Sequence, residues 1–365
     1  MRLIFLVLVI FSPLAALTPW GCSGSKSPSG PVTVTQVVTA TPVPNAGAVW
    51  QLALADTASP SSSQFPERYG LGTAVFNGAM WVVGGGGDSA PLNDSWSSPD
   101  GVHWTNVLPY SASPGTSQFS GRSNHAVVAY NGYLWVIGGY TGSGSLNDVW
   151  KSADGAHWTN VLPDTASPPT TQFPQRYSHV CLAYNGALWV ISGIGTSAIL
   201  NDVWSSTDGA HWTNVLAASP SPTTGQFPPK YAEGAVVYNG AMWLIGGAQS
   251  GMNEYNDVWN STDGIHWTQV LANNATPPST QFSQRLGLSA VVYNGALWVS
   301  GGGSPTSFND VWTSTNGAAW TETAVDAAFT ARIVFGMLAF NNDMWVIGGA
   351  GGGGNPYLND VWYSP

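Results

Sequence analysis

The tryptophans of this chain recur at regular intervals, and this repetition constrains the fold more than any other feature. All but one of the 19 tryptophans fall into three columns. The first column, in contexts such as LWVIGG, consists of Trp81, Trp135, Trp189, Trp243, Trp298 and Trp345. The second follows NDV or NDS and consists of Trp96, Trp150, Trp204, Trp259, Trp312 and Trp362. The third, mostly in HWT, consists of Trp50, Trp104, Trp158, Trp212, Trp267 and Trp320. A recurring period of about 54 residues indicates a repeat protein.

Each unit of the repeat has the pattern of four short strands. In the second unit, AVVAY is followed by Asn131-Gly132, a strong two-residue hairpin signal, and then by YLWVIGG. After a loop come NDVWKS, a second tight turn at Asp154-Gly155, and HWTNVL. The nearly continuous apolar runs indicate sheets that are covered on both faces. We therefore predict an all-β fold, a six-bladed β-propeller over residues 46–365.

The order of the columns predicts how such a ring closes. The chain begins with a third-column tryptophan, Trp50, and ends with a second-column one, Trp362. The last blade therefore lacks its outer strand, while the N-terminal segment has one to spare. We expect the strand that begins near Trp50 to complete the last blade, which removes the open sheet edges.

The repeated motif resembles the kelch repeat. RSNH at residues 122–125, the following hairpin and Gly138-Gly139 have counterparts in every unit. The third unit departs from this pattern with Ser192-Gly193, and the sixth has Asn342-Asp343 in a turn. The resemblance covers residues 46–365 and implies a kelch-type propeller of the kind that galactose oxidase also contains. It implies a binding role as well, because the arginine at this place contacts an acidic peptide in some kelch proteins.

Composition and charge narrow the range of partners. Charged residues make up 8% of the chain, and the formal net charge is −10. Nucleic-acid binding depends on basic surface, so DNA and RNA are excluded as expected partners, and an acidic membrane surface is equally unfavourable. We expect no cofactor, and a monomeric propeller.

The N-terminus has the pattern of an export signal. Arg2 precedes the apolar run LIFLVLVIF, and small residues follow it. Cys22 and the following SGSKSPSG resemble the lipobox and tether of a bacterial lipoprotein. We expect a signal peptide at 1–21, lipidation of Cys22, a tether at 22–45, and a location at the outer membrane, in the periplasm or on the cell surface. Ordinary secretion is the alternative, and the membrane is expected to be reached only through the lipid.

One face of the disc is expected to carry function. The spacing from the basic residue of each unit to its first-column tryptophan is constant, and so is the spacing from second to third column. These constant stretches contain the two hairpin turns, which share one face. The loops of variable length share the opposite face, and binding sites on rigid scaffolds usually lie on variable loops.

A basic residue opens the inner strand of each unit on that face. Two interpretations are open. In one, the residues form a cationic ring that binds carboxylates. In the other, each pairs with the aspartate of the NDVW/NDSW column and locks neighbouring blades together. The six basic residues are Arg68, Arg122, Arg176, Lys230, Arg285 and Arg332.

Three positions after each basic residue, polar and apolar residues share one column. Its members are Leu71, His125, His179, Glu233, Leu288 and Phe335. Two histidines and a carboxylate on adjacent units suit an acid/base pair or a metal triad, but we expect satisfied inner-strand histidines and no metal. Four other histidines precede third-column tryptophans and are expected to pack within the blades: His103, His157, His211 and His266. Cys181 is expected to be a buried, unreactive thiol.

Tyrosines near the same loops complete the candidate surface. Tyr69, Tyr177 and Tyr231 follow basic residues and stand among Ser, Thr, Asn and Gly, a mixture that stacks and hydrogen-bonds sugars or peptides. We therefore predict a non-enzymatic module that binds a glycan, a peptide or a protein. One alternative is a carbohydrate-active enzyme, similar to sialic-acid mutarotase or galactose oxidase, with Glu233, His179 and Arg176 as the catalytic candidates. A structural component of the cell envelope is another.

Overall fold

The structure of the protein is a computed structural model that describes residues 46–250, 253–303, 306–352 and 356–365. The predicted signal peptide, the tether and the lipidated Cys22 lie outside the described residues. Within them, the regular structure consists of β-strands, and no helix has the length and apolar character needed to cross a membrane. This confirms the all-β class.

The strands form antiparallel meanders in which sequence neighbours pair. One sheet has the order β2 (Gly72–Phe76), β3 (Ala79–Gly86), β4 (Pro91–Ser98) and β5 (Thr105–Leu108). The next meander has the order β6 (Ala126–Tyr130), β7 (Tyr133–Tyr140), β8 (Ser145–Ser152) and β9 (Thr159–Leu162). It is followed by β11 (Val180–Tyr184), β12 (Ala187–Gly195), β13 (Ile199–Ser206) and β14 (Thr213–Leu216). The short β10 (Arg176–Tyr177) pairs with both β8 and β12 and joins these two meanders.

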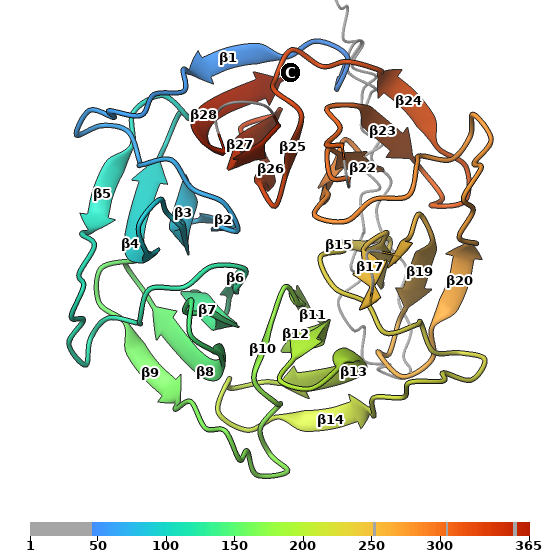
Figure 1. Ribbon diagram of the computed structural model, residues 1–365, viewed down its shortest axis with the longest axis horizontal. Helices are drawn as coiled ribbons and strands as arrows, with labels where there is room; N and C mark the ends of the chain where they lie inside the picture. Colours follow the sequence, from blue (N-terminus) through green and yellow to red (C-terminus); the bar gives the residue numbers. More distant parts are fainter. Residues whose placement is uncertain (1–45, 251–252, 304–305, 353–355) are drawn as a thin grey trace, which may run out of the picture. The chain divides into compact units, whose positions relative to one another are not determined.

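The remaining strands repeat the same order. One sheet consists of β15 (Gly234–Tyr238), β16 (Ala241–Ile245), β19 (Val258–Ser261) and β20 (Thr268–Leu271), with a small hairpin of β17 (Ala248–Gln249) and β18 (Asn253–Glu254) beside it. Another consists of β21 (Ser289–Tyr293), β22 (Ala296–Ser300), β23 (Val311–Ser314) and β24 (Thr321–Ala324). The last contains β25 (Arg332–Ile333), β26 (Gly336–Phe340), β27 (Asp343–Gly351) and β28 (Tyr357–Ser364). Figure 1 shows the sheets arranged radially around a common centre, which is a β-propeller.

The N-terminal strand belongs to the sheet of the C-terminal strand. β1 (Gln51–Leu54) pairs with β28, so that Gln51 lies opposite Tyr363 and Leu52 opposite Trp362. The backbone amide of Gly47 also donates a hydrogen bond to Ser364 Oγ at 2.8 Å. The seam therefore lies where the order of the tryptophan columns places it, as Figure 1 also shows.

The glycines of the outer turns allow adjacent sheets to approach. Gly155 has a φ of +75°, and a Cβ on it would lie 2.1 Å from the ring of Trp81 in the preceding sheet. Gly101, Gly209, Gly264 and Gly317 meet the first-column tryptophan of the preceding sheet in the same way. The first-column and third-column tryptophans are all buried, which explains why each unit carries them.

The histidines of the outer turns correct one prediction. The side chain of His157 is 84% exposed, and its Nδ1 lies 2.8 Å from Asp154 Oδ2. His103, His211 and His266 are equally exposed and make the same contact with Asp100, Asp208 and Asp263. These histidines do not pack within the blades, because the aspartate holds each ring on the outer side of its turn.

Candidate functional site

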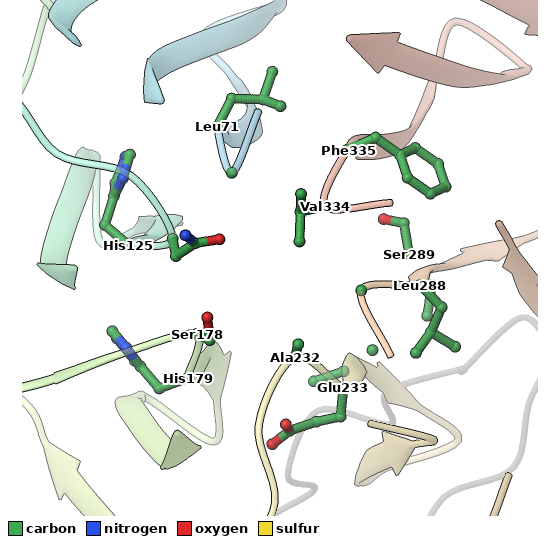
Figure 2. A pocket seen from close by; sticks show the side chains of 16 residues that line it. Leu71, His125, Ser178, His179, Ala232, Glu233, Leu288, Ser289, Val334 and Phe335 are labelled. Carbon is green, nitrogen blue, oxygen red and sulfur yellow. The ribbon is translucent and has the colours of Figure 1, made fainter. Parts of the chain in front are cut away.

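The candidate site is a central pocket on the face that carries the loops of variable length, which we call the loop face. It has a volume of about 200 Å³ and is lined by the residues that lead into the inner strands. Glycine, alanine, leucine and valine make up much of its wall, and Asn124, Ser178 and Ser289 add neutral polar groups. Figure 2 shows Ser178, Ala232, Val334 and Ser289 around the middle of this pocket.

A closed ring of backbone hydrogen bonds, which we call the collar, surrounds the pocket. Each member accepts a bond from the amide of the next member, at distances of 2.8 to 2.9 Å. All members have a left-handed φ between 48° and 64°. The collar consists of Gly70, Asn124, Ser178, Ala232, Gly287 and Val334. It ties the inner ends of the sheets together and fixes the width of the pocket.

The basic column is paired, and this settles the choice between its two interpretations. Arg122 donates bonds of 2.7 and 2.9 Å to the two carboxylate oxygens of Asp148 and one of 2.9 Å to the carbonyl of Gly138. Its side chain is fully buried. The other pairs are Arg68–Asp94, Arg176–Asp202, Lys230–Asp257, Arg285–Asp310 and Arg332–Asp360. The predicted cationic ring open to a ligand is therefore wrong, since each of these buried cations has a counter-ion, without which burial would be costly. The backbone amide of Arg122 also donates a 3.0 Å hydrogen bond to the carbonyl of Leu92 in the preceding sheet.

The histidines of the next column lie between sheets and do not face the middle of the pocket. His125 and His179 are each 6% exposed. A Cβ on Gly138 would lie 2.9 Å from Cε1 of His179, so the ring fits against this glycine of the preceding sheet. Burial, assisted by Arg176, lowers the pKa of His179 to about 3. Burial and Arg122 likewise lower that of His125 to about 3. Both imidazoles are therefore neutral at physiological pH, and neither makes a side-chain hydrogen bond of normal geometry among the described residues.

Glu233 occupies the same position in its unit, with a different neighbour. Its Oε1 accepts a hydrogen bond from Ser192 Oγ, whereas Oε2 is buried without a hydrogen-bond partner. Ser192 has a φ of 61° and replaces the glycine that its counterparts have, namely Gly84, Gly138, Gly246, Gly301 and Gly348. Burial raises the pKa of Glu233 to about 7. Ser192, the residue that departs from the glycine pair, is thus the one that donates a hydrogen bond to Glu233.

The three catalytic candidates are not brought together. Arg176 pairs with Asp202, His179 packs against Gly138 and Glu233 bonds to Ser192. Figure 2 shows His179 and Glu233 directed away from the middle of the pocket, each toward its own gap between sheets. Their contacts therefore define no common point at which a substrate atom would meet both an acid and a base.

The described residues offer no cluster of side chains that would bind a metal ion. No group of three His, Cys, Asp or Glu side chains suited to a metal ion occurs within residues 46–250, 253–303, 306–352 and 356–365. The Cys181 thiol lies beside a hydrophobic cluster, and burial raises its pKa to about 12. Its thiolate is therefore not populated at physiological pH.

Three tyrosines stand immediately before pocket-lining residues in the chain. Tyr69 stacks on Tyr357 with ring centroids 4.7 Å apart, and Tyr177 lies 5.1 Å from Tyr140. Tyr231 is half-buried, and its pKa is raised by burial and by the neighbouring Tyr177. Tyr69 and Tyr177 thus each contact another tyrosine, and all three tyrosines are partly buried residues that directly precede a collar residue in the chain.

The collar is the feature that reasoning from the sequence missed. Its members stand two positions after the basic residue, and they differ in size and polarity from unit to unit. Asn124, Gly70 and Gly287 are residue types that favour a left-handed backbone, and this preference is the one sequence signal of the collar. Ala232 and Val334 give no such signal, because alanine and valine do not favour the left-handed conformation that both adopt in the collar.

Comparisons with known proteins define the class. The model of the KLHDC2/KLHL20/DRC7 kelch-repeats domain matches residues 55–226 and 116–282, which is more than half of the chain. The chain therefore belongs to the kelch-repeat family, as the motif around Arg122 predicted.

The similarity to individual relatives extends over only part of each relative's length. A leucine-zipper-like transcriptional regulator 1 homolog of Drosophila melanogaster is 28% identical over 52% of this chain and 19% of its own length. The Homo sapiens leucine-zipper-like transcriptional regulator 1 is 24% identical over 64% of this chain and 28% of its own. Beta-scruin of Limulus polyphemus is 26% identical over 54% of this chain and 22% of its own. The chain thus spans less than a third of these relatives.

A solved structure supports the fold. The structure of YjhT superposes with a TM-score of 0.61 at 16% sequence identity and covers 84% of this chain and 96% of that one. At this identity the likeness concerns the β-propeller architecture alone.

Proposed function

We propose that this protein is a non-enzymatic binding module whose ligand, a glycan, a peptide or a protein, is contacted on the loop face around the central pocket. The observation that carries the proposal is the collar, which forms a rigid rim around a pocket lined by neutral polar groups. Membership of the kelch-repeat family supports a role in binding. Since the candidate acid, base and cation make separate contacts, we do not propose catalysis.

The test is an array of glycans, peptides and proteins probed with the purified protein. Tyr177→Ala removes a ring from the loop face, and His157→Ala removes an exposed ring from the opposite face. We expect a ligand whose binding falls at least tenfold in the first variant and is unchanged in the second. Equal loss in both variants, or a ligand that is indifferent to both, would show that the loop face is the wrong surface.

We further propose that the propeller has six blades. The proposal rests on six tryptophans in each column and on six members of the collar. A crystal structure of the protein would test it, and a ring with any other number of sheets would contradict it.

Export and lipid anchoring are also proposed, on the sequence of residues 1–22. We expect cells that express the protein to incorporate radiolabelled palmitate into it, and Cys22→Ser to abolish the label. Labelled Cys22→Ser protein, or unlabelled wild-type protein recovered from the medium, would instead indicate ordinary secretion or another attachment.

A further inference from the structure

The charges around the pocket limit the ligand that it can accept. The described residues carry seven Arg and Lys side chains against nineteen Asp and Glu. Six of the seven are fully buried in ion pairs. The seventh, Lys151, lies over the rings of Tyr133 and Trp135 and does not line the pocket. A carboxylate, phosphate or sulfate ligand would therefore find no free cation at the pocket and an acidic protein around it.

A cationic ligand lacks a counter-charge at the pocket as well. Glu233 is the one carboxylate residue among those that line it. Its carboxyl is directed toward the neighbouring sheet and bonded to Ser192. Burial keeps it protonated in a large fraction of molecules near neutral pH, since the pKa is about 7. An ammonium group placed in the middle of the pocket would lose its hydration without gaining an ion pair.

The uncharged polar groups of the pocket point to a hydroxyl-bearing ligand. Ser178 and Ser289 are half-buried, and their hydroxyls make no hydrogen bond within the described residues. The amide of Asn124 has only a long contact of 3.5 Å, to Ser123 Oγ. Covering these groups with a purely apolar ligand would cost about 1–3 kcal/mol for each unsatisfied group. Hydroxyl and amide groups can both donate and accept, which matches the edge of a polyol.

The rest of the wall and the rim suit the apolar side of a sugar. Ala232, Ala290 and Val334 line the pocket beside the polar groups, and Tyr69, Tyr177 and Tyr231 each directly precede a lining residue in the chain. Aromatic rings and aliphatic groups pack against the C–H face of a pyranose, while hydroxyls at its edge bond to polar side chains. A volume of about 200 Å³ leaves room for one small ring and not for an extended chain.

We infer that the central pocket binds a single uncharged sugar residue, with Asn124, Ser178 and Ser289 as its hydrogen-bonding groups. This inference rests on the proposed binding function and narrows it to one chemical class. It replaces the acidic ligands that an open ring of cations would have favoured.

The test compares the methyl glycosides of glucose, glucuronic acid and glucosamine, which share one ring configuration and differ in charge. The methyl glycosides of galactose and mannose are added as further neutral hexosides. Binding to the full-length protein is measured by saturation-transfer NMR and by calorimetry at pH 7. We expect at least one neutral hexoside to bind, and its glucuronide or amino-sugar counterpart to bind at least tenfold more weakly.

The variants are chosen so that the fold is preserved. Asn124→Gly and Ser178→Gly place at these positions the residue that the collar already has at Gly70 and Gly287, so the left-handed backbone is not strained. The control is Asn131→Gly, the same substitution at a φ of 48° in an exposed turn of the opposite face. We expect a tenfold or greater loss in each pocket variant and none in the control.

Three results would overturn the inference: no neutral hexoside binds, a charged sugar binds as well as the neutral one, or the pocket variants bind like wild type. If the array then still yields a peptide or protein ligand that depends on Tyr177, the proposed binding function stands and only the sugar class is wrong. If no ligand depends on the loop face, the proposed function itself is wrong.

Discussion

The basic residue of each repeat shows how burial decides the role of a side chain. A guanidinium at the start of an inner strand is a candidate for carboxylate recognition as long as its surroundings are unknown. In the folded chain, Arg122 meets Asp148, which lies 26 positions further along, and the aspartate also accepts a bond from the indole of Trp150. The charge of Arg122 is thereby used within the sheet.

The first prediction concerns this pair. Arg122→Ala leaves the buried Asp148 without a counter-ion, and we expect the free energy of unfolding to fall by about 3–5 kcal/mol. The measurement is urea denaturation followed by tryptophan fluorescence. His157→Ala breaks an exposed pair and should cost less than about 1 kcal/mol. A loss in Arg122→Ala that is as small as in this control would mean that the arginine is not held as described.

A second prediction follows from Glu233. Its pKa is about 7 in the folded state and near 4.5 in the unfolded chain, because burial disfavours the anion. The stabilisation from keeping this group neutral is complete below pH 4.5 and is lost as the pH rises to 7. Relative to Glu233→Gln, wild type should lose up to about 3 kcal/mol of stability across that range. A constant difference between the two proteins from pH 4 to 8 would contradict the raised pKa.

The histidines have the opposite dependence on pH, which gives a third prediction. The pKa of His179 is about 3 when folded and near 6.5 when unfolded, so its contribution is present above pH 6.5 and is lost as the pH falls. The column itself supplies the replacement, since Leu71 and Leu288 stand at the equivalent position. Relative to wild type, His179→Leu should become about 3 kcal/mol more stable at pH 4.5 than at pH 7.5. Parallel stability curves would show that His179 titrates normally.

At the scale of the element, two hairpin turns distinguish the effect of backbone conformation from the effect of packing. Gly132 and Gly155 have nearly the same φ, +76° and +75°. Nothing lies within 4 Å of a Cβ on Gly132, whereas a Cβ on Gly155 would meet Trp81 at 2.1 Å. The two hairpins look alike in sequence, and only the neighbouring sheet makes them different.

The fourth prediction uses this matched pair. Gly132→Ala should cost about 1 kcal/mol, the usual penalty for a side chain in the left-handed region. Gly155→Ala carries the same penalty and must also displace a buried tryptophan, so we expect a loss of more than about 3 kcal/mol. Thermal and urea denaturation of both variants provide the comparison. Equal losses would show that the turn and the tryptophan do not touch.

For the whole molecule, the seam and the collar close the ring at its outer and inner edges. β1 covers the outer edge of β28, and the collar links the inner ends of the sheets. The first and last described segments therefore stabilise each other, although more than 300 residues separate Gly47 from Ser364.

The fifth prediction tests the seam. Deletion of residues 46–54 removes β1 and exposes the backbone edge of β28, so we expect a lower melting temperature and concentration-dependent association in sedimentation velocity. Leu52→Ala, a change at a half-exposed side chain of the same strand, should leave both properties nearly unchanged. A monomeric deletion variant with the melting temperature of wild type would mean that the ring does not depend on β1.

The sequence by itself determined the all-β class, the kelch repeat, the strand order and the position of the seam, because spacing and turn residues act locally and recur in every unit. It also offered the pairing of Arg122 with the aspartate column as one of two alternatives, without deciding between them. Only the tertiary structure decided that the basic column is paired, that Glu233 turns toward Ser192, and that Ala232 and Val334 join the collar. These features depend on contacts between neighbouring sheets or between strands far apart in the chain. Distances and burial of that kind exist only once the ring has closed.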